Sequence, residues 1–153
     1  MRDILGISLG TRLVGLAVVY DDELIDFRVR KFYDVWSNEK RTEVIASITQ
    51  TVKRYGIKKI VVKTPKPYHC SQSITDLTDD IIALGEQHSI RVIVCTIATI
   101  LRKNKDENKQ SLMQSMLRKY SEHKQLERLY AKEQKNHAPY YAKLFEAIAC
   151  TEL

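Results

Sequence analysis

The sequence predicts an α/β fold with a five-stranded mixed sheet, in which three antiparallel strands come first and parallel strands are added, with helices on both faces. Short β-branched runs follow one another directly over the first 34 residues, which is typical of antiparallel strands joined by tight turns. Two later apolar runs, residues 57–63 and 90–95, alternate with segments of helical periodicity. Strands that alternate with helices pair in parallel, so the sheet is expected to be mixed.

The first three strands are predicted one after another. Residues 4–8 and 12–20 form the first pair, with Gly10 and Thr11 in the tight turn between them. An Asp-Asp pair supplies the next turn. The stretch ELIDFRVRKFYD then continues the sheet as a third strand, and its mixed polar and apolar pattern suits an edge.

Helices and strands alternate in the middle of the chain. The first helix is predicted with Asn38 or Ser37 as its N-cap and Gly56 at its end. IKKIVVK then reads as a short buried strand, and TPKPYHC as a loop, because two closely spaced prolines do not fit a helix interior. The next helix is expected to stop near Gly85, and IRVIVC is predicted to be another buried strand.

No further strand is predicted after Cys95. One apolar helical stripe, from Leu112 to Tyr120, either continues past Leu126 or gives way there to a new helix. The stretch YYAKLFEAIACTEL reads as a final amphipathic helix, with Pro139 in its first turn. Residues 1–153 are therefore expected to form a single domain.

Composition favours a soluble, globular, cytoplasmic protein. Apolar residues make up 44% of the chain and charged residues 29%, and no apolar run approaches the roughly 18 residues of a membrane span. The three cysteines have neither disulfide-framework nor zinc-site spacing. The net charge is +6, and residues 101–135 alone hold ten basic and five acidic residues. That segment is either an electrostatic footprint for a polyanion or an ordinary solvated helical face.

The first hairpin, ILGISLGTRLVGLAVV, together with the element order, resembles the ribonuclease H-like superfamily. The similarity is to RuvC-like Holliday junction resolvases and their YqgF relatives, whose hairpin has the form hydrophobic-G-I-D-x-G-T/S-R-x-x-G. Here the glycines, Ile7, Thr11 and Arg12 fit this pattern, whereas Ser8 stands in place of the acid. The stretch LTDDIIALGEQHSIRVIVCTIATILRKNKDENKQ also resembles the RuvC pattern, with a Thr-containing turn and a basic loop after the strand. A similar hairpin opens actin-like ATPases, but those need two such domains in a chain commonly more than twice as long.

The resemblance implies a two-metal nuclease site whose acids are missing here. In such nucleases, acids from the first strand, the fourth strand and the last helix hold two Mg²⁺ ions. The first two positions fall on Ser8 and Lys63. The last-helix positions fall within residues 137–144, where Tyr140 and Lys143 occur and no Asp or Glu does; Glu146 lies further into the helix. We therefore expect a pseudo-nuclease with no catalytic residues, no bound metal and no cofactor.

Two alternatives remain open. One is an active, metal-dependent junction endonuclease with a relocated site, which would use Mg²⁺ or Mn²⁺. The other is a protein-interaction scaffold. Acids at hairpin tips and helix starts are usually turn-formers or caps. The candidates for a relocated site are Asp3, Asp21, Asp22, Glu23, Asp26, Asp76, Asp79 and Asp80.

A basic binding surface is predicted around the former metal site. Its expected partner is branched or structured DNA or RNA, and a homodimer is left open. Lys63 would replace the positive charge of the metals, unless it points to solvent, and Tyr68 would stack on a base, unless it only packs its loop. The predicted binding residues are Arg12, Lys63, Lys66, Tyr68, Arg102, Lys103, Lys105 and Lys109.

Overall fold

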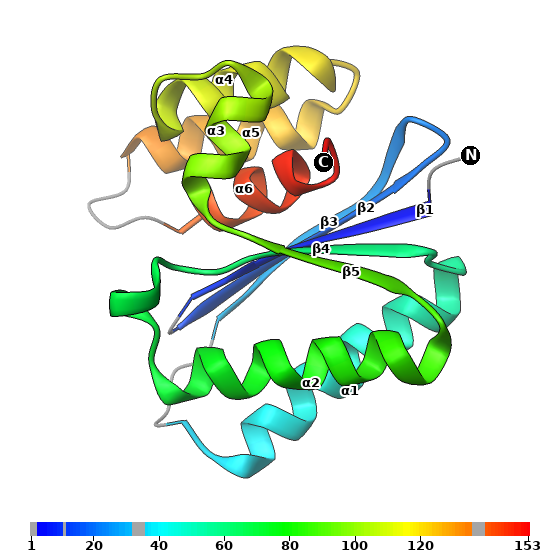
Figure 1. The fold of residues 1–153 in the computed structure, drawn as a ribbon. Coiled ribbons are helices and arrows are strands. Elements are labelled where there is room, and N and C mark those ends of the chain that lie inside the picture. Colours follow the sequence, from blue (N-terminus) through cyan, green and yellow to red (C-terminus); the bar gives the residue numbers. More distant parts are fainter. Residues whose placement is uncertain (1–2, 11, 32–35, 136–139) are drawn as a thin grey trace.

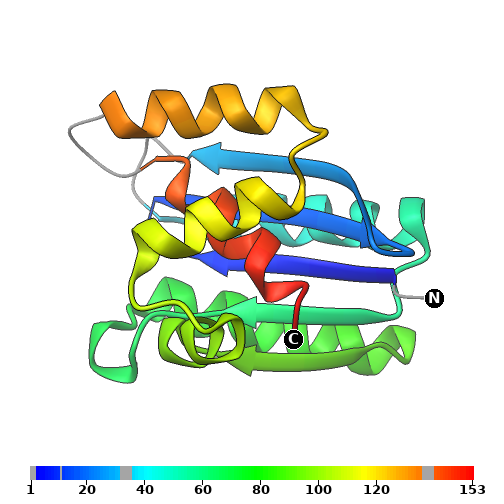
Figure 2. The same cartoon turned by 90° about the horizontal axis from the view of Figure 1, so that it is seen from above.

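The computed structural model describes residues 3–10, 12–31, 36–135 and 140–153. Its centre is one five-stranded sheet with the strand order β3-β2-β1-β4-β5 (Figure 2). The first three strands pair antiparallel, and β4 and β5 are added in parallel beside β1, as the sequence predicts. The strands are β1 (Asp3–Leu9), β2 (Leu13–Tyr20), β3 (Glu23–Lys31), β4 (Lys59–Lys63) and β5 (Arg91–Cys95).

Helices cover both faces of the sheet, which confirms the predicted fold class (Figure 1). Two long helices pack on one face and four shorter helices on the other. A short 3₁₀ turn at Pro67–His69 follows β4. The helices of the first face are α1 (Asn38–Tyr55) and α2 (Gln72–His88), and those of the second are α3 (Ile97–Asn104), α4 (Lys109–Lys119), α5 (Lys124–Lys135) and α6 (Ala142–Cys150). No helix in these described ranges is both long and apolar enough to cross a membrane.

The alternation of side chains along β1 creates two separate cores. Leu5, Ile7 and Leu9 are buried under α1 and α2. Ile4 belongs to the second core, which α3 to α6 cover. Because side chains alternate along a strand, Ser8 lies on the same face as Ile4 and points toward the second group of helices.

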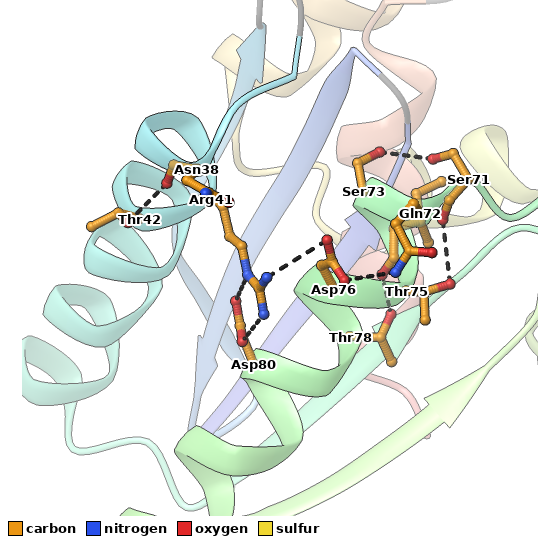
Figure 3. Close-up of polar contacts among 11 residues, drawn as sticks. Asn38, Arg41, Thr42, Ser71, Gln72, Ser73, Thr75, Asp76, Thr78 and Asp80 are labelled. Carbon is orange, nitrogen blue, oxygen red and sulfur yellow. Dashed lines mark hydrogen bonds and ion pairs between the residues drawn. The ribbon is translucent and has the colours of Figure 1, made fainter.

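The first helix begins and ends where its sequence predicts. The Ser37 hydroxyl accepts a hydrogen bond from the Lys40 N–H at 3.3 Å, and Gly56 closes the helix in the left-handed region, at φ 60°. Arg41 then joins α1 to α2: its guanidinium donates two hydrogen bonds to the Asp80 carboxylate, at 2.6 and 2.8 Å, and lies 3.6 Å from Asp76 (Figure 3).

Three predicted features differ in the structure. The helix α2 continues past Gly85 to His88, because Gly85 serves close packing: a Cβ there would lie 2.4 Å from Cγ2 of Val92. The strand β5 is an edge strand rather than a buried one, and 44% of Val94 is exposed. The basic segment after Thr96 begins as the helix α3, which ends at Asn104, and only residues 105–108 form a loop before α4. The predicted place of Pro139 lies outside the described residues.

Candidate functional site

Ser8 and Lys63 lie side by side near the carboxyl ends of two central strands. The parallel register between β1 and β4 pairs Ser8 with Lys63 directly. Both residues are buried, and both face the layer that contains α6. The two strand positions where the family resemblance expects acids are therefore neighbours in the structure.

Two glycines let α6 lie directly on the sheet. A Cβ on Gly6 would lie 2.0 Å from the carbonyl oxygen of Ala147, and one on Gly15 would lie 2.1 Å from that of Lys143. Neither position could hold a larger residue without moving the helix. Because α6 lies so close to the sheet, its Glu146 side chain can contact Ser8 and Lys63.

Glu146 forms the centre of the site. Its Oε1 atom lies 2.7 Å from Nζ of Lys63 and accepts a hydrogen bond from the hydroxyl of Ser8 at 3.2 Å. The side chains of Lys63 and Glu146 are only 4% and 2% exposed. This is a buried ion pair with a hydroxyl donor beside it, and each of its three members comes from a different element.

Two further lysines surround the same carboxylate. Nζ of Lys143 lies 3.7 Å from Oε1, and Nζ of Lys109 lies 3.7 Å from Oε2. Lys143, one helical turn before Glu146, is mostly buried, with 20% of its side chain exposed, whereas 53% of the Lys109 side chain is exposed. The cluster therefore combines one carboxylate with three ammonium groups, and its outer members reach the surface.

The cluster shifts the pKa values of its members. Burial raises the pKa of Glu146, but Lys143, Lys63 and Lys109 outweigh burial, so the pKa lies below its ordinary value and the carboxylate stays charged. Burial lowers the pKa of Lys143 to about 8; Glu146 opposes this shift, and the neighbouring Lys63 and Lys109 add to it. The attraction of Glu146 thus compensates only part of the burial cost of Lys143 and of its repulsion by the other ammonium groups.

The arrangement does not fit the two-metal centre that the resemblance implies. Magnesium prefers several anionic oxygen ligands. Here Ser8 is neutral, Lys63 and Lys143 are cations, and the carboxylate of Glu146 is already paired. Over the ranges that the structure describes, no three His, Cys, Asp or Glu residues gather in a way that could hold a metal ion.

The structure brings together three of the four positions at which acids were expected. Ser8, Lys63 and Lys143 meet around Glu146, whereas Tyr140 contacts other residues: its N–H donates to Glu133, and its ring packs edge-on against Tyr141. Sequence reasoning placed Glu146 too far along the helix to belong to the site. The signal that could have identified it is its spacing of three residues from Lys143, which places both on one helix face.

The structure places the predicted binding residues in different surroundings. Lys63 is buried, so its ammonium group faces Glu146 and not solvent. Arg12, Lys66 and Tyr68 are exposed on the segments after β1 and β4, at the same edge of the sheet as the site. Tyr68 is 74% exposed, and its ring centroid lies 6.0 Å from Nζ of Lys66.

The basic residues of α3 differ in position from Lys109. Arg102, Lys103 and Lys105 are exposed around the end of this helix. Lys103 lines a hollow with Lys59 and Asp3, which lie at the starts of β4 and β1 and thus away from the site. Lys109 is the member of this basic segment that reaches the cluster itself.

Five of the eight acids considered for a relocated metal site have ordinary structural roles. Asp76 and Asp80 bind Arg41 between the two helices in Figure 3. Asp26 accepts a hydrogen bond from the Tyr55 hydroxyl at 3.0 Å. Asp21 and Asp22 form the turn between β2 and β3, both with positive φ. These contacts match the ordinary roles of such acids in turns and helix packing.

Comparison with solved structures identifies the fold class. Thermus thermophilus RuvC in complex with a Holliday junction substrate superimposes with a TM-score of 0.75 and 14% sequence identity, over 99% of this chain and 91% of that one. The yeast mitochondrial Holliday junction resolvase Ydc2 gives a TM-score of 0.62 at 11% identity, over 99% of this chain and 77% of that one. No protein-family model and no curated protein matches the sequence. The chain thus has a ribonuclease H-like fold, and specifically a RuvC-like one.

Proposed function

We propose that this protein is a nucleic-acid-binding domain with a RuvC-like fold that has exchanged a two-metal nuclease centre for a cationic cluster. The observation that supports this most directly is the cluster around Glu146. Lysines stand at strand and helix positions where the resemblance expects carboxylates, and they give the site the opposite charge. Such a site attracts phosphate where an acidic site would attract metal.

The neighbouring surface supports the same proposal. Arg12 and Lys66 extend positive charge along this edge of the sheet, and the exposed ring of Tyr68 offers a stacking surface for an unpaired base. Binding of this kind needs no divalent cation, and it weakens as salt concentration rises, because released counterions contribute to it. Branched or structured DNA or RNA is the proposed partner.

The test is a binding titration combined with a cleavage assay. Purified protein is titrated into a labelled four-way DNA junction, a linear duplex, a single strand and a structured RNA, at two salt concentrations in EDTA. The same substrates are then incubated with Mg²⁺ or Mn²⁺. We expect salt-dependent binding in EDTA and intact substrate with metal.

Each other result contradicts part of the proposal. Cleavage with Mn²⁺ that is lost in Glu146→Gln would show an active endonuclease built on an unorthodox site. An absence of binding to all four nucleic acids at low salt would reject nucleic-acid binding and favour a protein-interaction scaffold.

A further inference from the structure

The charges around Glu146 do not balance. Lys63 and Glu146 form a nearly ideal pair at 2.7 Å, and together they are neutral. Lys143 and Lys109 each lie 3.7 Å from the same carboxylate, which is too long for a hydrogen bond. Among the residues that the structure describes, these two ammonium groups therefore lack an anion of their own, beside a largely buried ion pair.

We propose that Lys143 and Lys109 form a subsite for one phosphate of a nucleic-acid backbone, at the place where related folds hold metal ions. This inference rests on the proposed function. Lys143 and Lys109 contact the phosphate, and Ser8, Lys63 and Glu146 are positioning residues that fix the two lysines. Lys63 and Glu146 neutralise each other, so Lys143 and Lys109 leave the cluster with a net charge of about +2, and one phosphodiester would lower this net charge to about +1.

Glu146 does not prevent an anion from binding beside it. Its Oε1 atom is occupied by Lys63 and Ser8, so the negative charge is drawn toward the interior of the site. Its Oε2 atom is buried without a hydrogen-bond partner in the described structure and faces Lys109. The carboxylate thus attracts both outer lysines, while its own charge is neutralised from within.

The first hairpin leaves room for the side chain of Lys143. A Cβ at Gly10 would lie 2.8 Å from Cε of Lys143 and 3.4 Å from its Nζ, so the lysine stem passes directly over this glycine. A side chain at residue 10 would displace the ammonium group. Glycine therefore leaves room for the Lys143 ammonium group at the hairpin, two residues before the exposed Arg12.

The lowered pKa of Lys143 is consistent with a subsite that lacks its anion. Burial and the nearby Lys63 and Lys109 bring this pKa to about 8, despite the attraction of Glu146. A phosphate oxygen in contact with Lys143 would stabilise the charged ammonium group and reverse part of the shift. The geometry and the protonation equilibrium therefore favour the same type of ligand.

The experiment compares Lys143→Met, Lys109→Met and the double variant with the wild type. Lys53→Met is the matched control, because Lys53 is exposed on α1, on the other face of the sheet. Affinity for a labelled four-way junction and a duplex is measured by fluorescence anisotropy in EDTA over a range of salt concentrations. Each lysine that contacts a phosphate is expected to lower the salt slope by about one, equally for both DNAs.

The outcomes separate the subsite from the proposed function. If the wild type binds no nucleic acid, the proposed function itself fails and the subsite fails with it. If the wild type binds but the double variant retains its affinity and slope, the subsite is rejected and nucleic-acid binding stands. Equal loss in Lys53→Met would also reject the subsite, since the effect would then be one of net charge.

Two controls address folding and the source of the phosphate. Lys143→Met keeps the aliphatic stem and removes a repelling charge, so its urea midpoint should equal or exceed that of the wild type; a clear fall would overturn the assigned charge imbalance. Inorganic phosphate is compared with chloride at equal ionic strength as a competitor for the junction. If phosphate and chloride displace the junction equally well, the subsite is one for a backbone phosphate. If micromolar phosphate displaces the junction and chloride does not, the subsite is instead one for the free phosphate ion.

Discussion

Replacing Glu146 by Gln removes the charge that neutralises the buried Lys63 while preserving the size of the side chain. The three ammonium groups near this carboxylate then face one another without an anion. Lys63→Met has a different effect, since Glu146 keeps Lys143 and Lys109 as partners, each at 3.7 Å. We therefore expect the two variants to be destabilised unequally, although each removes one member of the same ion pair.

The distances set the size of this difference. With an effective dielectric constant of about 20, Lys63 at 2.7 Å attracts the carboxylate by about 6 kcal/mol, and a lysine at 3.7 Å by about 4 to 5 kcal/mol. Lys109 is half exposed, so solvent screens most of its share. After desolvation is included, we expect Glu146→Gln to lower the free energy of unfolding by about 3 to 5 kcal/mol. For Lys63→Met we expect only about 1 to 2 kcal/mol.

Urea unfolding, followed by circular dichroism at pH 7, measures the free energy of unfolding of both variants and of the double variant that combines Lys63→Met with Glu146→Gln. The double variant should be more stable than Glu146→Gln alone, because it removes the unpaired buried ammonium group. If Lys63→Met is at least as destabilising as Glu146→Gln, the reasoning about three competing lysines is wrong. The pKa of Glu146 is lowered on folding, so the difference between the wild type and Glu146→Gln should persist above pH 4.5 and shrink as pH falls further.

Three further predictions concern the same region. The pKa of Lys143 is about 8 and should rise when phosphate binds; the charged groups that face Lys143 are Lys63, Lys109 and Glu146. Junction affinity should therefore be full below pH 8 and fall above it by up to about tenfold per pH unit. Lys143→Met should remove this pH dependence. The Glu133 carboxylate accepts hydrogen bonds from the N–H groups of Tyr141 and Ala142, at 2.9 and 3.1 Å, so Glu133→Gln should cost about 1 kcal/mol in urea unfolding, against no change for the exposed Glu127→Gln. Gly15→Ala should cost at least about 1 to 3 kcal/mol, because its Cβ would lie 2.1 Å from the carbonyl oxygen of Lys143. A Cβ at Gly10 would meet the flexible Lys143 side chain at 2.8 Å and a backbone atom, the Leu13 carbonyl oxygen, only at 3.1 Å, so Gly10→Ala should cost less. Equal unfolding midpoints for the two would contradict the role of Gly15 in seating α6.

Local patterns in the sequence predict most of the fold. The hairpin, the cap at Ser37 and the end of α1 at Gly56 depend on short-range physics that a sequence displays directly. The misplaced end of α2 has a non-local cause, since Gly85 packs against Val92 on β5 and the chain turns only at Ser89. The edge position of β5 was equally difficult to predict, because an apolar run does not reveal that β4 is its single neighbour in the described sheet.

The site was only partly predictable for the same reason. The absence of acids at residues 8 and 63 is evident from the hairpin pattern and the strand order. The burial of Lys63 is not, because a lysine is normally exposed and its partner Glu146 lies 83 residues away in the sequence. The seating of α6 on Gly6 and Gly15, which are distant in the sequence, brings Glu146 to Lys63 and Ser8.

The position of α6 also has a consequence for how the chain folds. This helix lies over the central strands (Figure 2). Glu146 accepts a hydrogen bond from Ser8, which lies 138 residues earlier in the sequence. Contacts between such distant segments form slowly, because a long loop must close before they gain any energy. All five strands precede α6 during synthesis, so Ile4, Ala17 and Leu24 stay partly uncovered until the helix docks. Assembly of the lysine cluster and completion of the second core therefore both require α6 to dock, and without that helix the sheet would present an apolar face with Lys63 still solvated.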